Sequence, residues 1–213
     1  PDLDPAVLAL ALEARASALR RHEVGDDARL AVIDYSRPST QKRLWVFDMA
    51  RDALLFHEHV AHGSGTGDNL ARRFSNEDGS HATSLGLFRT AETYQGGNGY
   101  SLRLDGLDAG FNDRARSRAI VMHGAWYVNP DLIRTQGRLG RSQGCPALRQ
   151  QVAKVVIDTL KQRQLLFSYA DDAAFLQRGR SCACNGRSAG QILAAARAGT
   201  LGAGAAVGAV AAP

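Results

Sequence analysis

The sequence predicts a single mainly β domain with flanking helices, and three observations predict this fold class. The chain has 213 residues, 45% of them hydrophobic and 22% charged, which is enough to bury one sizeable core. Short runs of β-branched and aromatic residues alternate with turn-forming clusters through the middle of the chain. Apolar residues at helical spacing occur before this region and again near its end.

The first elements are a helix and a series of short strands. We expect the helix over residues 6–21, because Asp4 supplies a cap and Pro5 fits the first turn. The runs that follow are rich in strand-forming residues and are separated by Gly, Pro, Ser, Asn and Asp. Strands are expected over 30–35, 44–49, 54–60, 86–94, 100–104, 119–122 and 165–169.

A long loop and a second helix complete the pattern. Residues 62–84 are rich in Gly, Ser, Asn and Asp, and a loop of this length inside a compact domain is often functional. We expect a helix over 147–163, because Leu148, Val152 and Leu160 share one helical face.

The chain divides into three segments. Residues 1–28 form an N-terminal helical segment and residues 29–180 a β-rich domain. Residues 181–213 are dominated by Ala and Gly, so we expect a tail that is helical in part at 190–198 and has little to pack.

Charge and hydropathy limit the possible partners. The net charge is +5, and the cations are mostly arginine, which suits recognition of carboxylate or phosphate but also follows from a GC-rich genome. No aromatic-basic stripe or zinc-finger spacing favours nucleic acid, so an acidic partner of another kind is expected. No apolar run reaches the roughly 18 residues of a membrane span. The chain opens at Pro1 without a leader, as a trimmed or mature chain would, so its location stays open on this ground.

Cys145 is the candidate nucleophile. It lies in Gly144-Cys145-Pro146, and Pro146 suits the first position of the expected helix, which puts Cys145 at its N-cap. The unpaired N–H groups there would lower the thiol pKa, and those of Gly144 and Cys145 would bind an oxyanion. The alternative is that Cys145 is a small buried hydrophobe.

His123 is the candidate base. It closes an apolar strand and precedes Cys145, and an imidazole near a thiol is the usual proton acceptor. No acidic residue lies nearby in sequence to orient the ring, so the carbonyl of Gly124 is expected to do so.

The remaining polar residues allow more than one interpretation. Arginines 134, 138, 141 and 149 lie in a stretch without acidic residues, and form either a rim for substrate carboxylates or a solvated basic loop. His57, His59 and His62 alternate in facing, so no metal site is expected. Cys182 and Cys184 are spaced for a tight disulfide in an oxidising compartment.

Two motifs resemble the catalytic domain of murein L,D-transpeptidases of the YkuD type. They are His123-Gly124 at the end of a strand, and Gly140-Arg141-Ser142-Gln143-Gly144-Cys145-Pro146-Ala147, similar to the divergent branch with Ser-x-Gly-Cys-Pro. Phe74-Ser75-Asn76, Tyr94 and Asn112-Asp113 agree in order and spacing. The likeness covers about residues 30–170 and leaves the N-terminal helix and the tail outside.

The resemblance implies a curved mixed β-sheet or sandwich with a helix after the nucleophile, and residues 29–180 as the catalytic domain. It implies a periplasmic or cell-envelope enzyme whose leader lies outside this sequence, acting on peptidoglycan stem peptides without cofactor or metal. Cys145 would attack a stem-peptide carbonyl with His123 as base and Gly124 as orienting carbonyl. An amine acceptor gives a 3→3 or 1→3 cross-link. Water as acceptor would make a carboxypeptidase or endopeptidase, and a vestigial Cys145 a non-catalytic wall-binding module.

Two positions depart from the commoner family pattern. Gln143 stands where that pattern has histidine, and Ala147 stands where it has arginine. We expect Arg141 or Arg138 to replace the missing substrate clamp and His62 to fold over the site from the long loop, with Ser142 and Gln143 also contacting substrate. The oligomeric state is not predicted.

Overall fold

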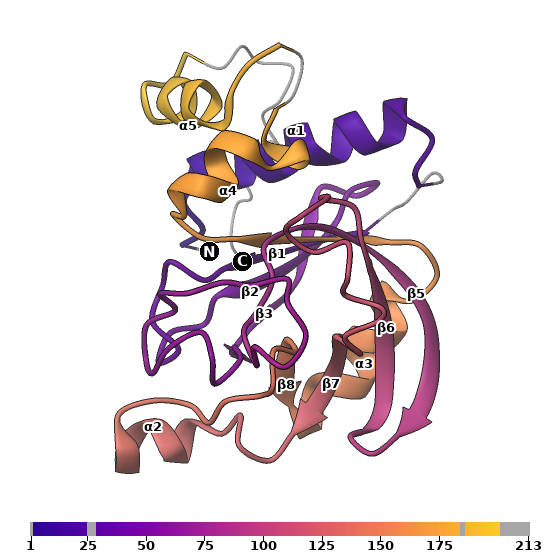
Figure 1. The fold of residues 1–213 in the computed structure, drawn as a ribbon, viewed down its shortest axis with the longest axis vertical. Helices are drawn as coiled ribbons and strands as arrows, with labels where there is room; N and C mark the ends of the chain where they lie inside the picture. Colours follow the sequence, from indigo (N-terminus) through magenta and orange to yellow (C-terminus); the bar gives the residue numbers. More distant parts are fainter. Residues whose placement is uncertain (1, 25–28, 184–185, 201–213) are drawn as a thin grey trace.

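The fold is a nine-stranded mixed sheet flanked by helices (Figure 1). The computed structural model describes residues 2–24, 29–183 and 186–200. The strand order is β3-β2-β1-β9-β5-β6-β7-β8-β4. The bounds are β1 (Arg29–Asp34), β2 (Leu44–Asp48), β3 (Ala53–Glu58), β4 (Val60–Ala61), β5 (Gly86–Gly96), β6 (Gly99–Gly106), β7 (Val121–Ala125), β8 (Ala147–Arg149) and β9 (Leu165–Tyr169).

The sheet curves back until its two edges nearly meet. The edge strands β3 and β4 are separated in the chain by His59 alone, so the opposite ends of the strand order lie close together. The pairs β1–β9 and β7–β8 are parallel, and the other pairs are antiparallel. The curved mixed sheet expected from the resemblance is therefore confirmed.

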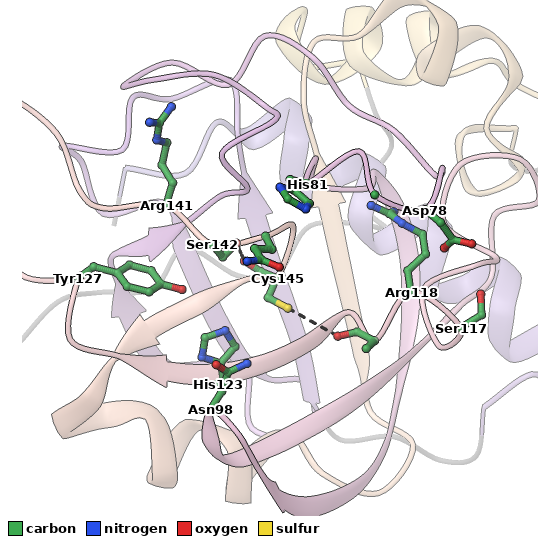
Figure 2. Close-up of a pocket in the computed structure, with 13 residues that line it drawn as sticks. Asp78, His81, Asn98, Ser117, Arg118, His123, Tyr127, Arg141, Ser142 and Cys145 are labelled. Atoms are coloured by element: carbon green, nitrogen blue, oxygen red, sulfur yellow. Dashed lines mark hydrogen bonds between the residues drawn. The ribbon is translucent and has the colours of Figure 1, made fainter.

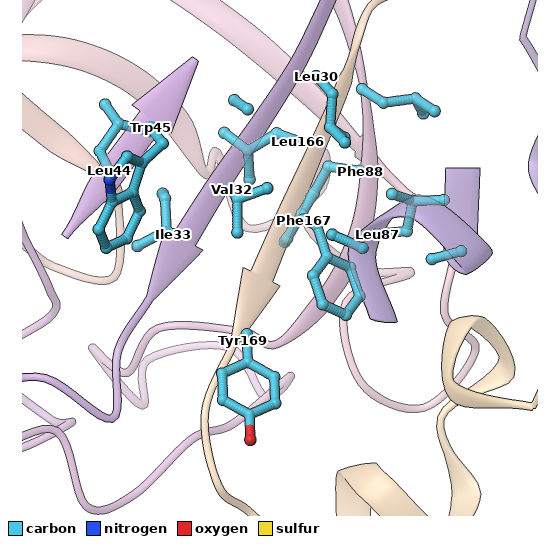
Figure 3. Close-up of a cluster of buried hydrophobic side chains, with 14 of the residues drawn as sticks. Leu30, Val32, Ile33, Leu44, Trp45, Leu87, Phe88, Leu166, Phe167 and Tyr169 are labelled. Carbon is cyan, nitrogen blue, oxygen red and sulfur yellow. The ribbon is translucent and has the colours of Figure 1, made fainter. Parts of the chain in front are cut away.

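The main core is one cluster of buried side chains from the sheet and from the helices packed on it (Figure 3). Strands β2 and β9 are buried at every position, and β1 at every position but the first. Strands covered on both faces are continuous apolar runs, which explains why these segments were recognisable as strands. Leu30, Val32, Leu166 and Phe167 are at most 1% exposed at the centre of the cluster.

The N-terminal helix α1 (Pro5–Arg20) lies across the outer face of the sheet. The Asp4 carboxylate accepts from the Ala6 N–H at 2.8 Å, and Pro5 fills the first turn, as the sequence predicts. Small side chains on its buried face let it pack closely on β1 and β9. The buried apolar residues are Ala6, Val7, Ala9, Leu10, Ala11, Ala14 and Ala18.

The expectation that the Ala/Gly-rich tail has little to pack is wrong for its first part. Helix α5 (Ala189–Arg197) begins with a capping box between Ser188 and Gln191 and packs against α1. Ile192 and Leu193 are buried in the same core as the sheet. Helix α4 (Ala173–Arg178) and a 3₁₀ turn (Arg180–Cys182) connect the last strand to α5. Residues 201–213 and Cys184 lie outside the described residues.

The helix expected over 147–163 begins later than the sequence predicts. Ala147 and Leu148 form β8 instead, pairing with His123 and Gly124 of β7, and helix α3 runs over Gln150–Leu160. Leu148 also pairs with Val60 of β4, so pairing on two sides outweighs the helical pattern. Cys145 is therefore not a helix N-cap, because the N-cap of α3 is Arg149.

The remaining elements agree with expectation within a few residues. The strand expected at 119–122 is β7, and Ala119 stands before it in a turn with φ +53°. The long loop 62–84 carries only isolated bridges. Helix α2 (Pro130–Gln136) lies in the connection between β7 and β8 and has no buried residue. Among the described helices none has the length and apolar character needed to span a membrane.

Candidate active site

A cavity of about 660 Å³ opens at the end of β7 (Figure 2). Its walls come from four parts of the chain: the loop 62–84, the β5–β6 turn, the segment before β7 and the connection from β7 to β8. It is lined by Asp78, Gly79, His81, Asn98, Ser117, Arg118, Ala119, His123, Tyr127, Arg141, Ser142, Gln143 and Cys145. The fold thus brings the predicted nucleophile and base into one cavity.

Cys145 lies in a turn that Ser142 braces. The Ser142 hydroxyl donates to the Cys145 carbonyl at 2.7 Å and accepts from the Gly144 N–H at 3.1 Å. Gly144 has φ +116°, a conformation essentially restricted to glycine. The turn therefore holds the Cys145 side chain in the cavity wall, with the residue 8% exposed.

The thiol is held between two backbone groups of the opposite wall. Its S–H donates to the Ala119 carbonyl at 3.7 Å, the dashed line in Figure 2. The Val121 N–H donates to Sγ at 3.5 Å. Burial raises the pKa of the Cys145 thiol, while the Val121 N–H and the Arg118 charge lower it to a smaller extent. This direction is opposite to the lowered thiol pKa expected for Cys145 at a helix end.

His123 is oriented by the carbonyl of Gly124. Nδ1 lies 2.9 Å from the Gly124 oxygen, which can only accept, so Nδ1 carries the proton and Nε2 has the free lone pair. Burial lowers the pKa of His123, so the ring is neutral at pH 7. The expected orienting contact is present, without an acidic residue.

Gly124 also allows α3 to pack closely behind the base. A Cβ at Gly124 would lie 2.9 Å from the Cβ of Ala153, closer than two side-chain carbons approach. The pairing of β7 with β8 places His123 opposite Ala147, which lies two residues after Cys145. The spacing of base and thiol therefore depends on the β7–β8 register.

The two expected oxyanion donors differ. The Gly144 N–H is engaged by the Ser142 hydroxyl. Within the described part of the chain, the Cys145 N–H has no hydrogen-bond partner and is the donor left over for an oxyanion.

Comparison with known proteins decides the family. The model of the L,D-transpeptidase catalytic domain matches residues 1–169. The chain belongs to this family. The match starts at residue 1, so it includes α1, which the resemblance left outside.

Several solved structures of L,D-transpeptidases are similar at low identity. An L,D-transpeptidase from Mycobacterium smegmatis is 15% identical with a TM-score of 0.40, and the match covers 67% of this chain and 59% of that one. One from Stackebrandtia nassauensis is 13% identical with a TM-score of 0.42, covering 78% and 66%. The helical cell shape determining protein Pgp2 from Campylobacter jejuni is 13% identical with a TM-score of 0.44, covering 77% and 57%. A search of curated proteins finds no match.

The four arginines expected to form a rim in this L,D-transpeptidase domain have acidic neighbours. Arg141 lines the cavity, but its guanidinium contacts the Asp68 carboxylate at 2.9 Å. Arg138 is not among the lining residues and lies 3.9 Å from Asp68. Arg149 binds both oxygens of Glu58, and Arg134 contacts Asp131. All four arginines of the predicted rim therefore have an acidic neighbour, and a role of Arg141 toward substrate carboxylates stays a prediction.

The other predicted substrate contacts divide in the same way. Gln143 is exposed in the cavity wall, whereas the Ser142 hydroxyl is committed to the turn. His62 does not fold over the site: it is 1% exposed, with Nδ1 2.7 Å from Arg43 Nη2 and Nε2 3.3 Å from the Gly67 carbonyl. Burial and the Arg43 charge lower the pKa of His62 to about 4.

The cavity contains residues that the sequence analysis did not single out. His81, with φ +51°, lines it from the long loop, and Arg118, Asp78, Asn98 and Tyr127 complete the wall. The motif Phe74-Ser75-Asn76 was the available signal for the loop, since Asn76 contacts Asp113. In the described residues, no group of three or more His, Cys, Asp or Glu is placed to hold a metal.

Proposed function

We propose that this domain is a peptidoglycan L,D-transpeptidase that forms cross-links between stem peptides through a Cys145 acyl-enzyme. The observation that carries the proposal is the pairing, in one cavity, of the Cys145 thiol with a His123 ring whose proton is held on Nδ1 by Gly124. That arrangement leaves Nε2 as a base of the kind needed to activate a neutral thiol.

The acylation step follows from these groups. His123 Nε2 takes the thiol proton, Sγ adds to the carbonyl of the L-centre, and the Cys145 N–H donates to the oxyanion. The imidazolium then gives its proton to the departing amine of the D-residue, and the carbonyl reforms as a thioester. Proton and leaving group are thus balanced within the cavity.

Transfer reverses the roles. The side-chain amine of a second stem peptide attacks the thioester while His123 removes its proton, and the thiol leaves with that proton. The product is a 3→3 or 1→3 cross-link, according to the acyl donor and acceptor. Water in place of the amine would give hydrolysis of the stem peptide.

The environment proposed for this reaction is the periplasm or cell envelope, where peptidoglycan stem peptides are found. The chain spans 59% of the length of the Mycobacterium smegmatis relative, so partners of the whole protein are part of this proposal. The two neutral reacting groups need no cofactor or metal for acyl transfer.

Incubation with purified tetrapeptide muropeptides and mass spectrometry of the products tests the proposal. We expect cross-linked dimers from the wild type and none from Cys145→Ala, with Cys182→Ala as a matched control that keeps the activity. Monomers shortened by one residue would identify a carboxypeptidase. Neither products nor a covalent adduct on Cys145 would refute an enzymatic role and favour a wall-binding module.

A further inference from the structure

Arg118 is a cation of the cavity wall that is fixed in place by one loop. Nη1 donates to the Ser75 carbonyl at 2.8 Å and to the Ser84 hydroxyl at 2.6 Å. Nη2 donates to the Ser80 hydroxyl at 3.0 Å and to the Ala82 carbonyl at 2.9 Å. Four hydrogen bonds to one loop leave the half-buried guanidinium little freedom to move toward a ligand.

The charge of Arg118 is not neutralised by a direct contact. Across the described residues, all its hydrogen bonds go to neutral oxygens, and none of its nitrogens forms an ion pair. Asp78, whose charge is coupled to Arg118, forms its ion pair with Arg114 at 2.7 Å. Arg141, the other arginine of the cavity, is paired with Asp68. Arg118 therefore brings a positive charge to the cavity wall that no direct ion pair among the described residues compensates.

The same loop positions the turn that carries the thiol. The Thr83 hydroxyl donates to the Gly144 carbonyl at 3.3 Å, and a Cβ on Gly144 would lie 2.9 Å from the Ala82 oxygen. Arg118 itself precedes Ala119, whose carbonyl accepts the Cys145 thiol. Arg118 and Cys145 thus line the same cavity, and the loop that fixes the guanidinium also contacts the turn of the nucleophile.

We propose that Arg118 is a positioning residue whose positive charge stabilises the thiolate of Cys145, which is followed by a strand and not by a helix. This inference rests on the proposed nucleophilic role of Cys145. The other titratable groups on the cavity wall are His123, Tyr127, His81, Asp78 and Arg141. From the core side, Tyr35 is also coupled to Cys145. Of these groups, Arg141 is the arginine besides Arg118, and its charge is paired with that of Asp68.

The alkylation rate of Cys145 by iodoacetamide, followed against pH by mass spectrometry of the Cys145 peptide, measures the thiolate directly. We expect the midpoint of this pH dependence to rise by about one pH unit in Arg118→Gln, because an opposite charge nearby lowers an acid's pKa by about 1–3 units. Arg118→Lys is expected to restore most of the shift, and Arg141→Gln to change it little. An unchanged midpoint in folded Arg118→Gln would overturn the proposal.

A second pair of variants leaves Arg118 unchanged and alters a residue that it contacts. Ser80→Asp places a carboxylate against Nη2 and is expected to raise the midpoint, while the neutral Ser80→Asn leaves it in place. Equal midpoints in these two variants would overturn the proposal even if Arg118→Gln does not fold. Alkylation needs no peptidoglycan, so a domain that fails to cross-link muropeptides but shows these shifts refutes only the proposed function.

Discussion

Replacing Gly144 by alanine is expected to disturb the turn that presents the thiol. The residue has φ +116°, and a Cβ there would lie 2.9 Å from both the Ala82 oxygen and the Ile120 Cδ1. The Ile120 methyl can rotate away. The Ala82 oxygen belongs to the backbone and is held by Arg118, so it cannot yield easily.

The magnitude follows from these two costs. Backbone strain at such a φ costs about 1–3 kcal/mol. Overpacking against a fixed neighbour costs about 1–3 kcal/mol. Gly144→Ala is therefore expected to lower the free energy of unfolding by about 2–6 kcal/mol, unless the turn moves and takes Cys145 out of position.

Urea denaturation combined with the alkylation rate of Cys145 separates these two responses. Either the free energy of unfolding falls by that amount, or the alkylation rate changes at nearly normal stability. Gly97→Ala is the matched control, because nothing lies within 4 Å of a Cβ there, and it should change the free energy by less than about 1 kcal/mol. A Gly144→Ala variant with wild-type stability and alkylation would refute the reasoning.

Three further predictions concern the base, an ion pair and the last helix. Burial lowers the pKa of His123, so the base form persists below its ordinary pKa of 6.5; the acid limb of kcat/KM for muropeptides should lie below pH 6.5, and His123→Gln should abolish turnover. Glu58→Gln weakens the bidentate contact with Arg149 and should lower the free energy of unfolding, measured by urea denaturation, by about 1–2 kcal/mol. An unchanged free energy of unfolding would show that the pair contributes nothing. Ile192→Ala leaves a hole beneath α5 and should cost about 2–4 kcal/mol, whereas a helix that merely rests on the surface would show no change in melting temperature.

Much of the fold was predictable because its central strands β1, β2 and β9 are buried on both faces. Leu30 to Ile33 and Leu165 to Tyr169 are apolar runs of strand length, and neither has helical spacing. Asp4 and Pro5 identify the start of α1 from local chemistry alone. The cysteine and histidine were recognisable because their motifs are short and contiguous.

What was not predictable depends on contacts distant in sequence. Ala147 and Leu148 fit a helix start as well as a short strand, and only pairing with β7 and β4 decides between them. Arg141 looked free because its partner Asp68 lies 73 residues away in the chain. From the sequence, His62 belongs to a polar loop that could fold over the site, whereas its contact with Arg43 holds it in the interior.

Parallel pairing of β7 with β8 has a consequence for how this site can diversify. Two parallel neighbours cannot be joined by a tight hairpin, so residues 126–146 must cross from one strand's end to the other's beginning. The β7–β8 ladder and the Ser142–Cys145 turn, rather than the earlier part of this crossover, set the positions of imidazole and sulfur. Substitutions or length changes around α2 can therefore remodel the connection while the reacting pair stays in register, which makes residues 130–137 the segment to exchange when a different acyl donor is wanted.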